Sequence, residues 1–261
     1  MLIWCTARLP VLDHDRGSLA IQRNAACIAC RRTMHIEEAI RIPVGATRLR
    51  GDLALVPWAR GIVAFVHGSG SSRLSPRNRA VAQQLNGAGL STLLFDLLTS
   101  EEEAIDARTR ALRFDIELLA QRLLCVVDWL GEQPRTAELR IGLFGASTGA
   151  AAALQVAAQR PRSIGAVVSR GGRPDLASVW LHRVRAPTLL IVGALDPEVL
   201  TLNEQAVRQL RAPCTLRTVA GATHLFEEPG ALEQVAHLAA DWFASRLGAP
   251  RALGPAGAEP C

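Results

Sequence analysis

Short apolar runs alternate with longer segments of helical spacing along most of this chain. Apolar runs of strand length, which predict strands, lie at 61–66, 90–95, 139–146, 164–169, 188–192 and 214–219. Two further strand-like runs, at 36–42 and 47–56, are separated by Pro43, Val44 and Gly45, a pattern that predicts an antiparallel hairpin.

Apolar residues at three- and four-residue steps predict helices between these strands. The expected helices cover 78–88, 114–130, 147–160, 198–210 and 230–247, and residues 97–113 are expected to form an exposed connection or a short helix. Strands that alternate with helices predict an α/β fold with a mainly parallel sheet and helices on both faces. Functional residues are then expected at the carboxyl ends of the strands.

The 261 residues show one continuous domain pattern, from 34 to 247, with no linker that would divide it. Residues 1–33 have no sustained period and are expected to form a poorly ordered N-terminal extension. Residues 248–261 are rich in Pro, Gly and Ala and are expected to be a disordered tail.

The formal net charge of +5 is spread along the chain rather than gathered on one segment, which argues against nucleic acid as a partner. No run of 18 apolar residues and no secretory leader occurs, so we expect a cytoplasmic protein without a membrane partner, either a monomer or a homodimer. Cys27 and Cys30 have CxxC spacing but lack a second ligand pair. Neither a metal nor an organic cofactor is expected.

Gly145-Ala-Ser-Thr-Gly149 follows an apolar strand and precedes an alanine-rich helix. This is the context of a nucleophile elbow, a sharp turn in which the two glycines remove Cβ atoms that would collide. We therefore expect Ser147 to be a nucleophile at a helix N-terminus, where negative charge is stabilised.

A serine nucleophile needs a base, and the base needs a carboxylate that orients it. Asp196 and His224 follow the strands 188–192 and 214–219, and the order Ser147, Asp196, His224 is that of the α/β-hydrolase triad. Each also has a simpler interpretation, since Asp196 before Pro197 could cap the next helix and His224 could be a loop histidine without a task.

The acyl-transfer intermediate carries an oxyanion that needs two N–H donors. We expect these to be the backbone N–H of Thr148, next to the nucleophile, and of Ser69, in the loop after strand 61–66. A phosphate-binding interpretation of this loop is not supported, because Arg73 breaks the dinucleotide pattern and the chain has no lysine for a Walker A loop.

With these motifs, the chain resembles the α/β-hydrolases, and among them the small, lid-poor esterases similar to dienelactone hydrolases. The resemblance covers about residues 36–247 and implies a serine esterase acting on small carboxylic esters. Dienelactone hydrolases proper have cysteine at the nucleophile position. Ser147 departs from that pattern and favours a general ester hydrolase.

The interval 170–186 is too short for a separate cap domain, so an open cleft is expected. Residues expected to contact the small-molecule ester substrate are His67, Gly68, Leu98, Arg170 and Trp180, and Arg173 is an alternative to Arg170 for holding a substrate carboxylate. Two other functions stay open. They are acyl transfer or haloperoxidase-like use of the same triad, and non-catalytic ligand sensing on this fold.

Overall fold

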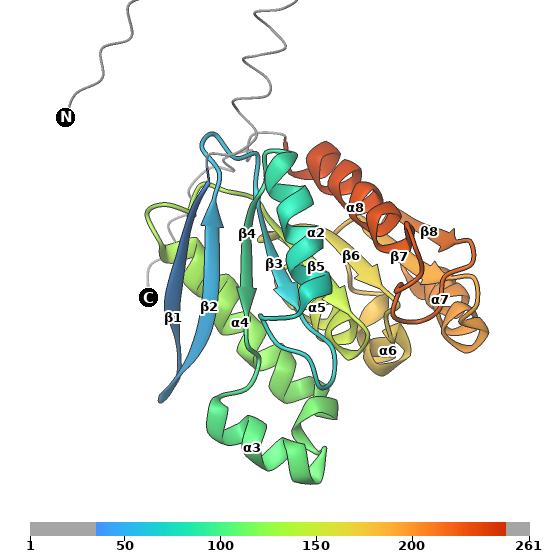
Figure 1. Ribbon diagram of the computed structural model, residues 1–261, viewed down its shortest axis with the longest axis horizontal. Helices are drawn as coiled ribbons and strands as arrows, with labels where there is room; N and C mark the ends of the chain where they lie inside the picture. Colours follow the sequence, from blue (N-terminus) through green and yellow to red (C-terminus); the bar gives the residue numbers. More distant parts are fainter. Residues whose placement is uncertain (1–34, 249–261) are drawn as a thin grey trace, which may run out of the picture. The chain divides into compact units, whose positions relative to one another are not determined.

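An eight-stranded mixed sheet runs through the part of the chain that the computed structural model describes, residues 35–248 (Figure 1). The strands are β1 (Ile36–Val44), β2 (Thr47–Leu55), β3 (Ile62–Val66), β4 (Ser91–Phe95), β5 (Ile141–Ala146), β6 (Ile164–Arg170), β7 (Thr188–Gly193) and β8 (Cys214–Val219). The helices are α2 (Pro76–Gly87), α3 (Ser100–Thr109), η2 (Leu112–Phe114), α4 (Ile116–Glu132), α5 (Thr148–Gln159), η3 (Pro174–Ala177), α6 (Ser178–Leu181), α7 (Pro197–Gln209) and α8 (Ala231–Leu247).

The strand order is β1-β2-β4-β3-β5-β6-β7-β8. β1 and β2 form the predicted antiparallel hairpin, and β2 runs antiparallel to β4. The remaining neighbours in the sheet, β4, β3, β5, β6, β7 and β8, are parallel to one another. The predicted α/β fold with a mainly parallel sheet is thus confirmed. Because parallel strands end at one edge, the loops after β3, β5, β6, β7 and β8 meet there.

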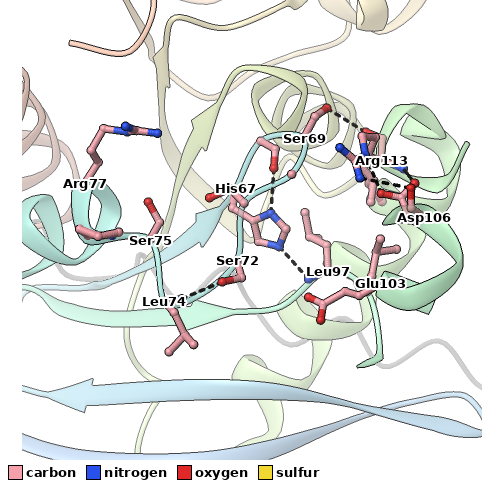
Figure 2. A pocket seen from close by; sticks show the side chains of 16 residues that line it. His67, Ser69, Ser72, Leu74, Ser75, Arg77, Leu97, Glu103, Asp106 and Arg113 are labelled. Atoms are coloured by element: carbon pink, nitrogen blue, oxygen red, sulfur yellow. Dashed lines mark hydrogen bonds and ion pairs between the residues drawn. The ribbon is translucent and has the colours of Figure 1, made fainter. Parts of the chain in front are cut away.

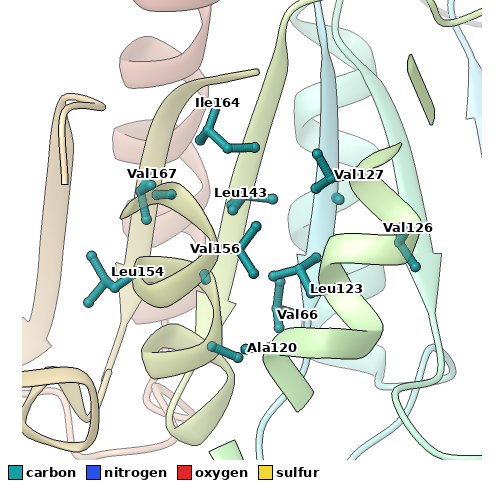
Figure 3. Close-up of a cluster of buried hydrophobic side chains, with 14 of the residues drawn as sticks. Val66, Ala120, Leu123, Val126, Val127, Leu143, Leu154, Val156, Ile164 and Val167 are labelled. Atoms are coloured by element: carbon teal, nitrogen blue, oxygen red, sulfur yellow. The ribbon is translucent and has the colours of Figure 1, made fainter. Parts of the chain in front are cut away.

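Helices cover both faces of the sheet, as the alternating pattern predicts. In Figure 1, α2 and α8 lie over one face, while α4 and α5 lie over the other. Figure 3 shows the second layer, where Leu123 and Val127 of α4 and Val156 of α5 pack against Leu143 and Val66 of the sheet. Burial of each such side chain contributes about 1.5–3 kcal/mol, so these layers hold the strand ends in fixed positions.

Several predicted boundaries differ from the observed ones. α2 begins two residues earlier than expected, because Ser75 accepts a hydrogen bond from the Asn78 N–H and Pro76 fits the first turn. The predicted helix 114–130 is divided into η2 and α4, with Asp115 capping α4. The hairpin turn lies at Gly45 and Ala46, because Pro43 and Val44 still pair with β2.

The stretch 97–113, expected to be an exposed connection or short helix, contains α3. Thr99 and Glu102 form a reciprocal capping box at its start. Between β6 and β7 the chain forms only η3 and α6, so this interval carries no cap domain, as predicted.

The proposed extension 1–33 lies outside the described residues, and so does the proposed tail except for Gly248. Between His35 and Gly248, none of the helices combines the length and the apolar character that crossing a membrane requires.

Two glycines allow close backbone approaches around the turn that contains Ser147. A methyl group placed at Gly149 would lie 2.2 Å from the Val66 carbonyl oxygen and 2.5 Å from that of His67. One placed at Gly145 would lie 2.4 Å from the Cα of Ala150. The expectation that glycine is needed where the strand and the helix of this turn pass each other is confirmed for Gly145, whereas Gly149 is needed where α5 meets the end of β3.

Replacement of Gly149 with alanine is expected to lower the free energy of unfolding by about 3 kcal/mol or more, because two backbone carbonyls would have to move. Gly131→Ala is the matched control. Nothing lies within 4 Å of a methyl group at Gly131 in α4, so this substitution should raise the free energy of unfolding by about 0.5–1 kcal/mol. Urea denaturation of both variants measures the difference, and equal stabilities would contradict the packing described here.

Candidate active site

Ser147 occupies a strained turn between β5 and α5. Its φ is 50° and its ψ is −121°, a backbone conformation with positive φ that residues other than glycine rarely adopt. The turn is held on both sides by backbone hydrogen bonds, since the Ser147 N–H donates to the Arg170 carbonyl at 3.2 Å and its carbonyl accepts from the Arg173 N–H at 3.1 Å. The predicted strand–turn–helix geometry is present, with Ser147 half-buried at the sheet edge.

The backbone N–H of Thr148 is the first amide of α5. The first amides of a helix have no acceptor within the helix and sit at the positive end of its dipole. This amide directly follows Ser147, and its role in stabilising an oxyanion stays a prediction.

Asp196 and His224 are brought together from the loops after β7 and β8. Oδ2 of Asp196 lies 2.7 Å from Nδ1 of His224. Although Asp196 precedes α7, its side chain makes no capping hydrogen bond, so the simpler interpretation of Asp196 as a helix cap is wrong. The carboxylate instead contacts the imidazole at Nδ1, which leaves Nε2 on the opposite side of the ring.

The two loops can approach because Gly193 lacks a side chain. A methyl group there would lie 2.3 Å from the Ala222 carbonyl oxygen. The same carbonyl accepts a hydrogen bond from the Leu195 N–H at 2.9 Å, which ties the loop carrying Asp196 to the loop carrying His224.

Ser147 and His224 both contact the segment that follows β6. A methyl group placed at Gly171 would lie 3.5 Å from Cε1 and Nδ1 of His224, and the neighbouring Arg170 carbonyl accepts from Ser147. In the described part of the chain, the Ser147 hydroxyl forms no hydrogen bond with His224. Such contacts are often long without substrate and shorten when it binds.

The loop after β3 lies directly against Ser147. A methyl group placed at Gly68 would lie 3.0 Å from the Ser147 Cβ. The Ser69 N–H donates to the Thr148 hydroxyl at 3.1 Å, and the Ser69 hydroxyl donates to the Arg113 carbonyl at 3.3 Å. The amide expected to stabilise the oxyanion is thus already hydrogen-bonded, and its role requires the Thr148 hydroxyl to turn away. That role stays a prediction.

His67 fastens this loop to the end of β4 (Figure 2). Its Nδ1–H donates to the Gly68 carbonyl at 3.0 Å, and its Nε2 accepts from the Leu97 N–H at 3.0 Å. Burial lowers the pKa of His67, so the ring is neutral at pH 7. Both nitrogens are occupied, and the substrate contact expected of His67 stays a prediction.

As the pH is lowered, the free energy of unfolding should decrease more steeply in the natural chain than in His67→Gln. The folded-state pKa of His67 lies below its ordinary value of 6.5, so the unfolded chain takes up the proton first as the pH falls. A protonated Nε2 would also face the Leu97 N–H. Urea denaturation on either side of pH 6.5 measures this, and equal pH dependence in the two proteins would contradict it.

A cavity of about 530 Å³ lies beside this loop (Figure 2). Gly68 and Leu98, both expected to contact substrate, are in its wall. So are Asp106 and Arg113, whose ion pair of 2.6 Å holds the segment between α3 and α4 against Ser69. Sequence reasoning missed these two residues, because nothing in their spacing indicates that they meet.

Two candidate arginines, one at the end of β6 and one in the loop after it, differ in their partners. Arg173 pairs with Asp175 at 2.8 Å, which ties down the loop and leaves it poorly suited to hold a substrate carboxylate. Arg170 is buried, with 8% of its surface exposed, and its Nη1 has no hydrogen-bond partner in the described part of the chain. Trp180 is half-buried, with the Arg183 guanidinium 5.5 Å from its ring centroid. Substrate contact by Trp180 stays a prediction.

Comparison with known proteins identifies relatives of this fold and site. Residues 53–246 match the family described as the dienelactone hydrolase family. The crystal structure of a dienelactone hydrolase from Anabaena variabilis ATCC 29413 is 57% identical, covers 81% of this chain and 98% of that one, and superimposes with a TM-score of 0.80. Est1E from Butyrivibrio proteoclasticus, at 17% identity and a TM-score of 0.69 over 81% of this chain and 99% of that one, shows the same fold.

A longer curated relative comes from Mycobacterium tuberculosis (strain ATCC 25618 / H37Rv) and is named "Putative phosphoribosyl transferase". It is 57% identical over 221 residues, which are 85% of this chain and 48% of that protein. The chain therefore spans about half the length of this curated relative.

Proposed function

The chain belongs to the dienelactone hydrolase family, and we propose that it is a serine hydrolase that cleaves small carboxylic esters through an acyl-enzyme on Ser147. The observation that carries this proposal is the 2.7 Å contact between Asp196 and His224, beside a strained serine at a helix N-terminus. A carboxylate, an imidazole and a serine at one sheet edge are the parts that acyl transfer needs.

In the first step, Nε2 of His224 takes the proton of the Ser147 hydroxyl as its oxygen attacks the ester carbonyl. Asp196 stabilises the imidazolium that forms. The tetrahedral oxyanion accepts from the Thr148 N–H and, once the Thr148 hydroxyl turns away, from the Ser69 N–H. Collapse of this intermediate breaks the ester C–O bond, and His224 passes the proton to the leaving alkoxide.

In the second step, water attacks the acyl-enzyme. His224 takes a proton from that water, the bond between the acyl carbon and Ser147 breaks, and the proton returns to the serine oxygen. The products are an alcohol and a carboxylic acid. The absence of a cap between β6 and β7 favours substrates that enter an open cleft.

This chain matches 48% of the curated relative that is named a putative phosphoribosyl transferase. We propose that the phosphoribosyl transferase name refers to the segment that this chain does not match, since residues 53–246 of this chain match the dienelactone hydrolase family. Phosphoribosyl transfer is therefore not the activity that we assign to Ser147.

A series of p-nitrophenyl esters with increasing acyl chain length tests the proposal. We expect release of p-nitrophenol above the uncatalysed rate, with the highest kcat/KM for short acyl chains. A folded protein that cleaves none of these esters would contradict the proposal and would favour ligand sensing without catalysis.

A further inference from the structure

The end of β6 and the loop after it connect Ser147 with His224. The Arg170 carbonyl accepts from the Ser147 N–H at 3.2 Å, and the Arg173 N–H donates to the Ser147 carbonyl at 3.1 Å. Between these two bonds lies Gly171, where a methyl group would lie 3.5 Å from Nδ1 and Cε1 of His224. The path of this backbone therefore sets how far the serine stands from the imidazole.

The middle of this loop is held by a side chain from α7. Nδ2 of Asn203 donates to the Gly172 carbonyl at 2.9 Å and to the Val199 carbonyl, one turn earlier in α7, at 2.8 Å. Within residues 35–248, the Gly172 carbonyl accepts from no other donor. The amide of Asn203 is therefore a direct link between α7 and the loop that contacts the proposed nucleophile and base.

Asn203 is buried in a way that packing alone does not explain. Its exposed fraction is 0%, and its Oδ1 has no hydrogen-bond partner within the described residues. A buried polar atom without a partner is costly, and an apolar side chain at this position would avoid that cost. What the amide supplies is its two N–H donors, one of which reaches out of α7 to the loop.

α7 also follows directly on the third member of the proposed triad. Asp196 is the residue before α7, and its carbonyl accepts from the Leu200 N–H at 2.9 Å. Asn203 lies about two turns later in the same helix. One helix thus joins the acid at its beginning to the loop between Ser147 and His224 at its middle.

We propose that Asn203 is a positioning residue for acyl transfer: its amide holds the Gly172 carbonyl to α7 and so fixes Ser147 and His224 at the separation that proton transfer needs. This inference rests on the proposed ester hydrolysis at Ser147. Asn203 is fully buried, so it acts through the loop and not on the substrate. A misplacement of about 1 Å can slow a reaction about 100-fold, which makes a single hydrogen bond at this point important.

Asn203→Thr tests this role. Threonine is similar in size to asparagine, and its hydroxyl can still donate to the Val199 carbonyl, as Thr201 does to Pro197 at 3.0 Å in the same helix. Only the hydrogen bond to Gly172 is lost. We expect kcat for a p-nitrophenyl ester to fall about 10- to 100-fold, with KM changed less than about twofold. Asn203→Ser, which is smaller, should show the same result if the threonine variant does not fold.

Asn86→Thr is the matched control. Nδ2 of Asn86, near the end of α2, donates to the Leu90 carbonyl at 2.9 Å and to the Thr92 hydroxyl at 3.1 Å. Both partners lie where β4 begins, at the sheet edge opposite to the proposed triad. This variant should lower the Tm, as Asn203→Thr does, and keep kcat within about twofold of the natural value. If Asn203→Thr also keeps its kcat, Asn203 only stabilises the fold and the proposal is refuted.

The proton between His224 and Asp196 gives a readout that does not depend on turnover. This hydrogen bond, 2.7 Å long, should give a downfield ¹H NMR signal that is assigned by its loss in His224→Ala. We expect Asn203→Thr to shift or broaden the signal and Asn86→Thr to leave it unchanged. If the signal behaves in this way but the natural chain cleaves no ester, only the proposed function fails. If esters are cleaved and Asn203→Thr changes neither kcat nor the signal, only the positioning role fails.

Discussion

Replacement of Ser147 with alanine is expected to lower kcat for a p-nitrophenyl ester by about 10⁶-fold, close to the loss expected for His224→Ala. The reason is that the two side chains perform one chemical step, in which the hydroxyl attacks only as the imidazole removes its proton. Without either group, only binding and the oxyanion donors remain. Steady-state kinetics of the purified variants measures both losses.

The double variant supplies the sharper result. Ser147→Ala with His224→Ala should be about as slow as either single variant, because each substitution alone already stops the shared step. Ser245→Ala, in α8, is the control. Among residues 35–248, its hydroxyl hydrogen-bonds only to the Trp242 carbonyl, so the variant should keep its activity. Losses that multiply in the double variant would contradict a joint role for Ser147 and His224.

Asp196→Asn is expected to lower kcat about 10⁴-fold with little change in the fold. An asparagine can donate an N–H to Nδ1 of His224, which would place the ring proton on Nε2 and remove the base that faces Ser147. The 2.7 Å contact would survive, so the loss tests the tautomer rather than the position of the ring.

The matched control for this variant is Asp128→Asn. Asp128 pairs with Arg160 on the surface, and the activity should not change when that ion pair is lost. If Asp196→Asn were as active as Asp128→Asn, Asp196 would have no part in orienting the base, and its contact with His224 would be structural only.

The features that could be predicted from the sequence are those encoded locally. Apolar runs and helical spacing predicted the sheet and its layers, because burial of one strand or one helix face is written in neighbouring residues. The turn at Ser147 could be predicted for the same reason, since Gly145 and Gly149 flank it and each meets backbone atoms that exclude a Cβ. Asp196 and His224 were placed together because both follow strands that end at one edge.

The features that the sequence left open depend on which side chains meet across the fold. Arg170 and Arg173 are equivalent candidates in the sequence, yet within the described residues only Arg173 has a carboxylate within reach. The hydrogen bond from the Ser69 N–H to the Thr148 hydroxyl joins residues that are 79 positions apart. A pattern of residue types does not report such distances.

Covalent labelling tests the central claim most directly. The chain is treated with a p-nitrophenyl ester, quenched with acid during turnover, digested and analysed by mass spectrometry. We predict an added acyl mass on the peptide that contains Ser147 in the natural chain, and no adduct in Ser147→Ala. In Asp196→Asn, the acyl form should accumulate if deacylation is slowed more than acylation. Ester turnover without an adduct on Ser147, or with the adduct on another residue, would contradict the mechanism.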